Sequence, residues 1–560
     1  MPNATHALPN HAAFSDPVSQ AIISQAIAPP PNTPQLPTLP DQLPSSPVPI
    51  LPPIPPSSPT RDPAEPLKVK VQEIRVLGST VFSDTQFAEV VAPFIGKELA
   101  FEELLTIRTA ITDRYIREGY VTSGAFLPPQ DVSSGIITLQ VIEGRLEEID
   151  VQGLTRLNSG YVKERLEIAG GTPLNLQRLE SALQLLQLNP LFRSVQAELR
   201  SGTAPGQSIL AVTLQESAPL SIATFVENRN SPNVGSLGPS LEASYRNVSG
   251  LGDQLYAQVG TTEGSLNYEF SYSVPINARD GTLVFRYLNN KTRIVEPAFD
   301  ALDIRSNNET FSLGIRQPLI RTITDEFSLG LSLDLRQSQT FLFGSTPFSF
   351  SVGAEKGRSQ VTVLRFSQDW INRSPSQVLA ARSQFNIGLN ALGATVNNTG
   401  VDGLFLSWIG QFQWVQAIGN NTTSVVRIAS QLTGDALLPL EQFSVGGIDT
   451  VRGYRPNQQV GDSGIVGSVE VRFPITTAPD GIGTIQLVPF IDIGTTWNHR
   501  DAGIAPTLLA STGLGLRWQL DPYFFARVDF GIPLHSANHS NSSFSGSNIF
   551  FSLRLQLPPI

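Results

Sequence analysis

The sequence predicts a membrane β-barrel of about sixteen antiparallel strands, preceded by two tandem α+β modules. Three observations support this prediction. A strand-like segment recurs after 75 residues, and helical and then strand-like patterns follow each copy. From residue 217 onward, segments of about ten residues alternate apolar side chains with polar or small ones. No run of eighteen or more apolar residues occurs, which argues against a helical membrane span but leaves a barrel open.

Composition limits the kind of protein further. The chain has 560 residues and no cysteine, which excludes a disulfide scaffold, thiolate metal sites and cysteine nucleophiles. A chain without cysteine can also cross an oxidising compartment without forming wrong disulfides. The formal net charge of -10 argues against a nucleic-acid partner, because such proteins carry a basic surface.

The first 66 residues predict a short helix and a linker rather than a folded domain. Residues 1–28 form an amino-terminal segment in which Asp16 and Pro17 predict the start of an amphipathic helix. The proline-rich stretch 29–66 favours extended polyproline II, and therefore a semi-rigid linker, with an SH3-type ligand as the alternative. Met1 is not followed by a basic and an apolar stretch. For an exported protein we therefore expect a start upstream or a misassigned one.

The repeat divides the next 150 residues into two modules. The segment Glu73–Gly78 recurs as Glu148–Gly153, an offset of 148 − 73 = 75 residues. After the first copy, the pattern predicts helices over 84–95 and 101–118 and strands near 120–127 and 136–142. The second copy repeats this β-α-α-β-β order. The sequence thus predicts modules at 67–144 and 145–216, each with an edge strand that an extended polypeptide can join.

The last part, 217–560, predicts the barrel. Apolar residues at alternate positions, as from Phe327 to Leu335, suit lipid on one face, while the other face carries charges such as Glu470 and Asp529. The alternative is a soluble β-sandwich, which has the same period but buries its apolar face. An even number of strands closes a barrel without free edges. The predicted segments begin near 221, 237, 253, 266, 282, 307, 325, 359, 377, 403, 423, 463, 484, 508, 524 and 548.

A long stretch between the eleventh and twelfth segments carries the candidate site. It contains the motif Val451, Arg452, Gly453 and Tyr454, and a later strand contains Phe490, Asp492 and Gly494. Alternation along that strand points Phe490 and Asp492 into the lumen. A carboxylate in a partly dehydrated interior needs a partner, and a guanidinium such as that of Arg452 can bind it through two hydrogen bonds. Alternatively, Asp492 faces lumen water and Arg452 lies on an exposed loop. These residues alone do not decide between the two arrangements.

The order of elements and the loop motif carry a specific resemblance. The two modules resemble POTRA (polypeptide-transport-associated) domains, which implies that they receive a client chain in the periplasm. Val-Arg-Gly-Tyr on a long loop, with Phe-x-Asp-x-Gly on a later strand, resembles the outer-membrane assembly and transport superfamily. The whole arrangement is similar to the translocators of two-partner secretion, the haemolysin-activator and filamentous-haemagglutinin transporter family. The chain departs from the pattern at its carboxy terminus, Leu557 to Ile560, where the family usually ends on an aromatic residue.

The resemblance implies a function for each part. A protein of this family lies in the outer-membrane lipid and secretes a client polypeptide, a large β-helical exoprotein, through its barrel. The loop tip folds back into the pore, where Arg452 contacts Asp492, with weaker roles for Phe490 and Gly494. Residues 16–28 plug the barrel until the client displaces them. The alternatives are an assembly insertase of the same superfamily and a diffusion porin.

Other motifs predict no catalytic or cofactor site. Residues Gly461 to Gly464 (Gly-Asp-Ser-Gly) match the nucleophile environment of trypsin-like proteases, but that chemistry needs a histidine base, and none of the five histidines lies in a recognisable motif. His535 and His539 have metal-like spacing without an evident third ligand. No phosphate-binding glycine loop occurs, which indicates a protein without nucleotide. The sequence therefore predicts no enzyme, no cofactor and no metal.

Overall fold

The computed structural model describes residues 68–398, 400–419, 421–478, 481–499, 507–520, 523–535 and 548–558. They form two compact units: residues 68–217 with 249–252, and the remaining residues from 218 onward. The predicted amino-terminal segment 1–28 and linker 29–66 lie outside the described residues. Among the described residues, no helix is both long and apolar enough to cross a bilayer.

The first module is a three-stranded sheet covered by two helices. In the sheet order β2-β5-β4, β2 and β5 are parallel, and β4 and β5 are antiparallel. The first predicted helix ends early, because Pro93 lies in the 3-10 turn Ala92–Phe94 and lacks the N–H that an α-helix needs. The elements are β1 (Lys68–Lys70), β2 (Glu73–Leu77), α2 (Asp84–Val91), β3 (Glu98–Ala100), α3 (Phe101–Arg117), β4 (Gly124–Phe126) and β5 (Ile136–Ile142), with β1 and β3 as a separate antiparallel pair.

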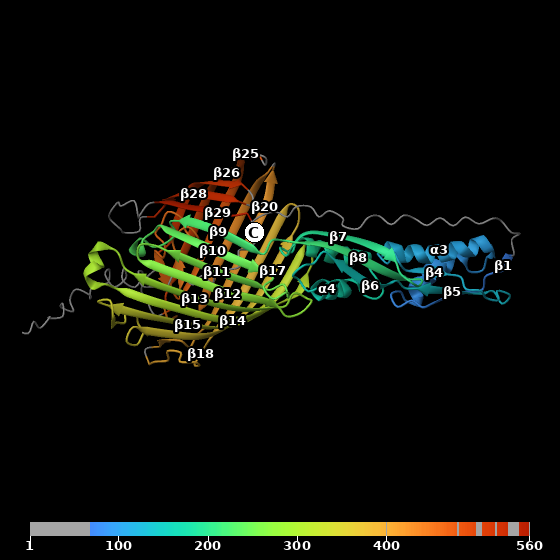
Figure 1. Cartoon of the computed structure of the whole chain (residues 1–560), viewed down its shortest axis with the longest axis horizontal. Coiled ribbons are helices and arrows are strands. Elements are labelled where there is room, and N and C mark those ends of the chain that lie inside the picture. The colour runs from blue at the N-terminus through green and yellow to red at the C-terminus, as the bar shows by residue number, and fades with distance from the viewer. Residues whose placement is uncertain are drawn as a thin grey trace, which may run out of the picture. The chain divides into compact units, whose positions relative to one another are not determined.

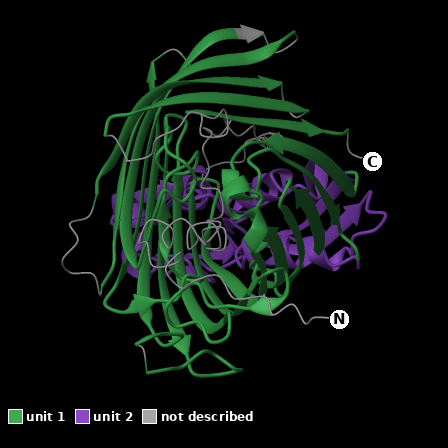
Figure 2. Cartoon of the chain, turned by 90° about the vertical axis from the view of Figure 1, so that its left-hand side faces the viewer, with its two compact units in different colours: residues 1–45, 218–248, 253–560 green, residues 46–217, 249–252 purple. Residues whose placement is uncertain are grey.

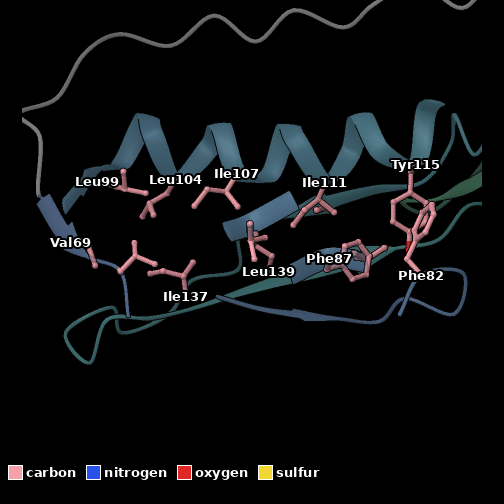
Figure 3. Close-up of a cluster of buried hydrophobic side chains, with 14 residues drawn as sticks. Val69, Phe82, Phe87, Leu99, Leu104, Ile107, Ile111, Tyr115, Ile137 and Leu139 are labelled. Carbon is pink, nitrogen blue, oxygen red and sulfur yellow. The ribbon is translucent and has the colours of Figure 1, made fainter. Parts of the chain in front are cut away.

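Helix α3 covers this sheet with one apolar face. Its inward residues Leu104, Ile107, Ile111 and Tyr115 are spaced by three and four positions, which places them on one side of a helix. Figure 3 shows Leu104, Ile107 and Ile111 pointing toward Ile137 and Leu139 of β5, while Tyr115 points toward Phe82; all of them belong to one buried cluster. The helix therefore forms because packing against β5 stabilises its amphipathic face.

The second module repeats the arrangement around its own core. In the sheet order β6-β8-β7, β6 and β7 are edge strands. Leu179, Leu183 and Leu186 are buried on the inner face of the second helix, and Leu176 is half-buried. The elements are β6 (Arg145–Gln152), α4 (Gly160–Gly170), α5 (Leu176–Gln187), β7 (Phe192–Ser201) and β8 (Gln207–Glu216).

A glutamate at the end of the last strand holds the same loop in each module. Glu143 accepts hydrogen bonds from the Thr80 N–H at 2.7 Å, the Val81 N–H at 3.2 Å and the Tyr115 hydroxyl at 2.9 Å. Glu216 accepts them from the N–H groups of Thr155, Arg156 and Leu157 at 2.8–2.9 Å. Burial by itself raises the pKa of both carboxyls, but these hydrogen bonds outweigh it and hold each pKa below its usual value.

We expect Glu143→Gln to destabilise the first module at neutral pH, because the charged acceptor of four hydrogen bonds is lost; the cost is about 1–3 kcal/mol. A lowered pKa contributes stability above the pKa of the unfolded chain, and this stability is lost as the pH falls through the folded value. Pulse proteolysis of the full chain in urea should therefore show a wild-type advantage at pH 7 that shrinks below about pH 4. The exposed Glu198 provides the control variant, Glu198→Gln. A difference that does not change with pH would contradict this account.

In the second unit, sixteen long strands of the described chain close into an antiparallel barrel (Figure 1). Each begins within three residues of its predicted start; the largest difference is 406 against 403. Figure 2 shows the strands as a wall around an interior. The strands are β9 (Leu220–Glu227), β10 (Gly238–Arg246), β11 (Gln254–Thr261), β12 (Ser265–Pro275), β13 (Thr282–Arg293), β14 (Arg305–Arg321), β15 (Asp325–Leu342), β17 (Arg358–Arg373), β18 (Gln377–Leu389), β20 (Leu406–Gly419), β21 (Thr422–Thr433), β25 (Ser463–Ala478), β26 (Gly483–Trp497), β27 (Leu509–Leu520), β28 (Phe524–Pro533) and β29 (Ile549–Gln556), with the two-residue β16 (Thr346–Pro347) added beside β15.

The two faces of the wall differ as a membrane barrel requires. Ile491 and Leu331, on the outer face, are 61% and 51% exposed, whereas the inward Glu470 and Asp492 are almost fully buried. A soluble sandwich would bury the apolar residues instead. The prediction of a membrane barrel is therefore confirmed, and the sandwich is excluded.

The barrel closes between its first and last strands over a short distance. Only residues Ser552–Gln556 of β29 pair with β9 among the described residues. The side chain of Asn228 then continues the pairing, because its amide accepts a hydrogen bond from the Phe551 N–H at 2.7 Å and donates one to the Ile549 carbonyl at 2.9 Å. One asparagine thus takes the place of a further strand residue.

Two connections add short strands outside the barrel ladder. β19 (Val401–Asp402) pairs in parallel with β22 (Ala436–Leu437), and β23 (Phe443–Val445) pairs antiparallel with β24 (Gln459–Gly461). The second pair belongs to the stretch between β22 and β25, residues 438–462, called here the long loop.

Candidate functional site

The long loop carries its motif into the interior of the barrel. Val451, Arg452 and Tyr454 are 0%, 2% and 5% exposed. Val451 and Tyr454 pack with Val466 and Leu509 of strands β25 and β27 in one apolar cluster. The motif is therefore enclosed by the wall, and the alternative of an exposed loop is excluded.

Arg452 binds Asp492 of β26 through both of its carboxylate oxygens. The Arg452 Nε donates to Oδ2 and Nη2 donates to Oδ1, each at 2.7 Å, and the Arg452 backbone N–H adds a bond of 3.1 Å to Oδ2. The Ser468 hydroxyl completes the set with a bond of 2.7 Å to Oδ1. Planar guanidinium and carboxylate groups fit in this two-bond geometry, which fixes both the position and the orientation of the loop.

Two further inward-facing carboxylates contact Arg452. The Nη1 of Arg452 lies 3.2 Å from Glu470 on β25 and 3.3 Å from Asp529 on β28. Glu470 also pairs with Arg427 at 3.3 Å and Arg472 at 2.8 Å. Strand alternation predicts that Glu470 and Asp529 face the lumen, but their convergence on Arg452 depends on the register of the barrel strands, which a single sequence does not give.

The aromatic ring of Phe490 packs against the face of the Arg452 guanidinium. The Cζ of Arg452 lies 3.5 Å from the centre of the Phe490 ring, a cation–π contact. The ring itself lies over Gly513 on β27, where an added Cβ would come within 2.4 Å of the ring edge. The Arg452 guanidinium therefore packs on the Phe490 ring, and the ring packs on Gly513. Any side chain at position 513 would collide with the ring.

The glycines of both motifs lie where the loop meets the wall. Gly453 has a φ of +89°, and a Cβ there would lie 2.8 Å from the backbone of Gly531 on β28. At Gly494, a Cβ would lie 2.8 Å from Val445 Cγ1 and 3.0 Å from Val451 Cγ2. The loop backbone therefore packs directly against the backbone of β28, and loop side chains pack directly against the backbone of β26.

Tyr454 contributes both packing and its hydroxyl. The ring belongs to the apolar cluster around Val451, and the hydroxyl donates to the Ala510 carbonyl at 2.9 Å and to the His535 carbonyl at 3.0 Å as alternative acceptors. The tip of the long loop, residues 446–458, is thus attached to strands β26, β27 and β28 through three consecutive motif residues.

The remaining sequence motifs have structural surroundings. The Ser463 hydroxyl accepts a bond from the Thr433 N–H at 3.1 Å, and no histidine side chain contacts it among the described residues. The backbone of His535 bonds Tyr454, while His539 lies outside the described residues. No group of three or more potential metal-binding side chains occurs in the described part of the chain.

Beside the long loop, the lumen holds a cavity of about 790 Å³. Arg286, Arg365 and Arg382 line it on the wall, and Gly447 and Asp449 line it on the loop. A barrel wide enough for an aqueous interior, lined by arginines, partly filled by a loop and preceded in the chain by α/β modules, defines an outer-membrane transport protein.

Comparison with known proteins identifies the family. Residues 206–518 match the family described as "Haemolysin secretion/activation protein ShlB/FhaC/HecB", and residues 69–144 match the ShlB-type POTRA domain. The outer membrane transporter CdiB of Escherichia coli O6:K15:H31 is 26% identical over 444 residues, which are 77% of this chain and 73% of CdiB. The structure of CdiB from Escherichia coli has a TM-score of 0.70 at 22% identity, covering 90% of this chain and 93% of that one; CdiB from Acinetobacter baumannii has 0.64 at 19%, covering 98% and 100%.

The family match covers more than half of the chain, which therefore belongs to the haemolysin secretion/activation protein family ShlB/FhaC/HecB. It is a two-partner secretion translocator of the outer membrane, with its POTRA region in the periplasm. It secretes a partner protein through the β-barrel.

Proposed function

We propose that Arg452 and its loop form the gate of the secretion pore. The closed state is held by the bonds between Arg452 and Asp492, by contacts with Glu470 and Asp529, and by the Phe490 ring. The tip occupies lumen space that a polypeptide needs, so it must leave for secretion. The buried two-bond contact between Arg452 and Asp492 is the observation that supports this proposal most directly.

Opening requires a ligand that favours the open state. A shift from about 1% to about 99% open needs about 5.5 kcal/mol of differential affinity. A client chain that fills the lumen supplies such a difference, because it occupies the volume of the tip and can itself contact the released carboxylates. In this scheme, folding of the client outside the cell gives the transport its direction.

We propose that the client first binds the edge of the second module. Strand β7 is an edge strand of ten residues, and its outward row includes the exposed Arg193, Gln196 and Glu198. An extended segment can add to such an edge through backbone hydrogen bonds. The charged row discourages pairing with other sheets, which keeps an edge strand available without aggregation.

Site-specific crosslinking tests this entry route. The chain has no cysteine, so Gln196→Cys places a single thiol on β7. Under oxidising conditions we expect a disulfide with a client that carries one cysteine in its extended amino-terminal region. Glu167→Cys, exposed on helix α4, is the matched control and should give at most about a tenth of that product. Equal crosslinking at both positions would remove β7 from the route.

The remaining parts of the chain complete the proposal. We propose that residues 16–28 plug the lumen, that 29–66 act as a linker and that 67–144 and 145–216 act as two separate modules before the barrel at 217–560. The client is proposed to be a large β-helical exoprotein in an extended state. In this proposal, transport proceeds without catalysis, nucleotide or cofactor, since binding and folding of the client supply the free energy. The proposed partners are the client and outer-membrane lipid rather than nucleic acid.

A further inference from the structure

We infer that the long loop has two mechanical parts, and that Glu441 positions the part that stays on the wall. The root consists of residues 438–445 and 459–462, and the tip consists of residues 446–458. During secretion the tip leaves the lumen while the root remains attached. This inference rests on the proposed gating role of Arg452, which belongs to the tip.

Glu441 attaches the root to strands β15 and β17, away from the Arg452 site. Its carboxylate accepts a bond of 2.7 Å from Arg336 on β15 and bonds of 2.8 and 3.1 Å from both terminal nitrogens of Arg365 on β17. Arg336 also donates to the Leu440 carbonyl at 2.5 Å. The Glu441 and Arg336 side chains are only 6% and 5% exposed. A contact so well enclosed holds the root in one position.

The charges around Glu441 balance only while the root is in place. Arg365 also pairs with Asp334 of β15 at 2.5 Å, so two arginines face two carboxylates. Moving Glu441 away would leave two buried guanidinium groups with a single carboxylate. Removing one partner of a buried ionic group is costly, because the charge left behind has lost both water and its counter-ion.

The two segments of the root, 438–445 and 459–462, are also joined to each other. The Gln431 side chain donates to the Glu441 carbonyl at 2.8 Å and to the Asp462 carbonyl at 2.9 Å. The Asp462 carboxylate accepts from the Leu437 N–H and the His499 N–H, each at 2.9 Å. The Gln442 side chain of the first segment also donates to the Asp462 carboxylate at 3.1 Å, so the aspartate of the protease-like motif connects both segments of the root to His499, just beyond the end of β26. Apolar packing of Leu438 and Leu440 against Val361 and Val363 of β17 adds to the attachment.

The tip begins and ends at residues with unusual backbone conformations. Gly446 and Gly447 have φ values of +118° and +96°, and Asn457, at the other end, has +58°. Adjacent glycines tolerate large backbone changes at low cost. The two ends of the tip are therefore the natural pivots between the fixed root and the Arg452 segment.

Two engineered disulfides that share one wall position test the division directly. A Cβ at Gly494 lies 2.8 Å from Val445 Cγ1 in the root and 3.0 Å from Val451 Cγ2 in the tip. In a disulfide, the Cβ of one cysteine lies about 3.0 Å from the sulfur of the other. Val445→Cys with Gly494→Cys therefore locks the root, and Val451→Cys with Gly494→Cys locks the tip, in a chain without native cysteine.

The readout is client secretion in the oxidised state divided by secretion in the reduced state of the same variant, with Gly494→Cys alone as the baseline. We expect a ratio near one for the root lock and a reversible loss of at least about tenfold for the tip lock. A root lock that blocks secretion would overturn the division of the loop. A tip lock that does not block it would overturn the proposed gate instead, so the two failures are distinguishable.

Variants of Glu441 test the anchor itself and do not depend on Gly494. Glu441→Ala should lower secretion about fivefold or more, because the root no longer positions the tip. The reversed pair Arg336→Glu with Glu441→Arg restores the charge balance and should recover much of the secretion. Such recovery would show that Glu441→Ala acts through the lost ion pair and not through the lost side-chain volume. Asp369→Asn is the control, since Asp369 pairs with Arg382 on the neighbouring strands β17 and β18 without any loop residue. Unchanged secretion in Glu441→Ala would exclude the anchor.

Discussion

Replacing Arg452 with alanine is expected to lower client secretion at least about tenfold while the barrel still assembles. The variant removes the group that binds Asp492, Glu470 and Asp529, and leaves Asp492 buried without its guanidinium. Breaking a buried ion pair on one side costs about 3–5 kcal/mol. The tip is then no longer held in the single orientation from which the arriving client displaces it, and it obstructs the lumen in other positions. Secretion by intact cells is the measurement.

Two controls separate gating from misfolding. Heat-modifiable gel mobility should show an assembled barrel for Arg452→Ala. Arg452→Lys keeps the charge but loses the planar pair of hydrogen bonds, so its secretion should fall between wild type and alanine. Wild-type secretion by the alanine variant would remove Arg452 from the mechanism.

The second large effect is expected for Gly531→Val, which should displace the tip from β28. A Cβ at position 531 would lie 2.5 Å from the Gly453 nitrogen and 2.8 Å from its Cα. Backbone atoms cannot yield as a flexible side chain does, so the tip must move away and release the contacts of Arg452. We expect higher ion conductance of the purified protein in planar bilayers, by about threefold or more.

Gly467→Ala is the matched control, because it adds a Cβ to a barrel glycine where space exists. The nearest atom to that Cβ, apart from adjacent backbone, is Ile493 Cγ2 at 3.6 Å, an ordinary contact. Its conductance should equal that of the wild type. If Gly531→Val conducts no more than Gly467→Ala, the contact between Gly453 and Gly531 does not hold the tip in place.

Most of the architecture could be predicted from the sequence, because apolar residues recur with the period of a helix in the modules and with the period of a strand in the barrel. The helical stripe of α3 and the two-residue alternation of strands such as β15 mark which face is buried and which is exposed. Strand starts were predicted well because polar turns separate the segments. The end of α2 was not, since Pro93 shortens an otherwise helical pattern.

The candidate site could be predicted only in part. Strand parity directs Asp492 inward, and the charge of Arg452 suggests its partner, so this pair is accessible to sequence reasoning. The contacts of Glu470, Asp529 and Glu441 are not, because they join segments as far apart as 105 positions through barrel register. Nothing local to Glu441 distinguishes it from any other loop glutamate; only closure of the ring brings Arg336 and Arg365 to it.

The short pairing between β9 and β29 affects how the barrel closes and where it opens first. Five paired positions there compare with fifteen between β15 and β17. The ring is closed only when β9 and β29 pair, and among the neighbouring long strands that the structure describes, this pair joins the fewest residues. Under heat or mechanical tension, we expect the cylinder to rupture at this line before any other and to flatten into an open sheet that begins at β9 and ends at β29.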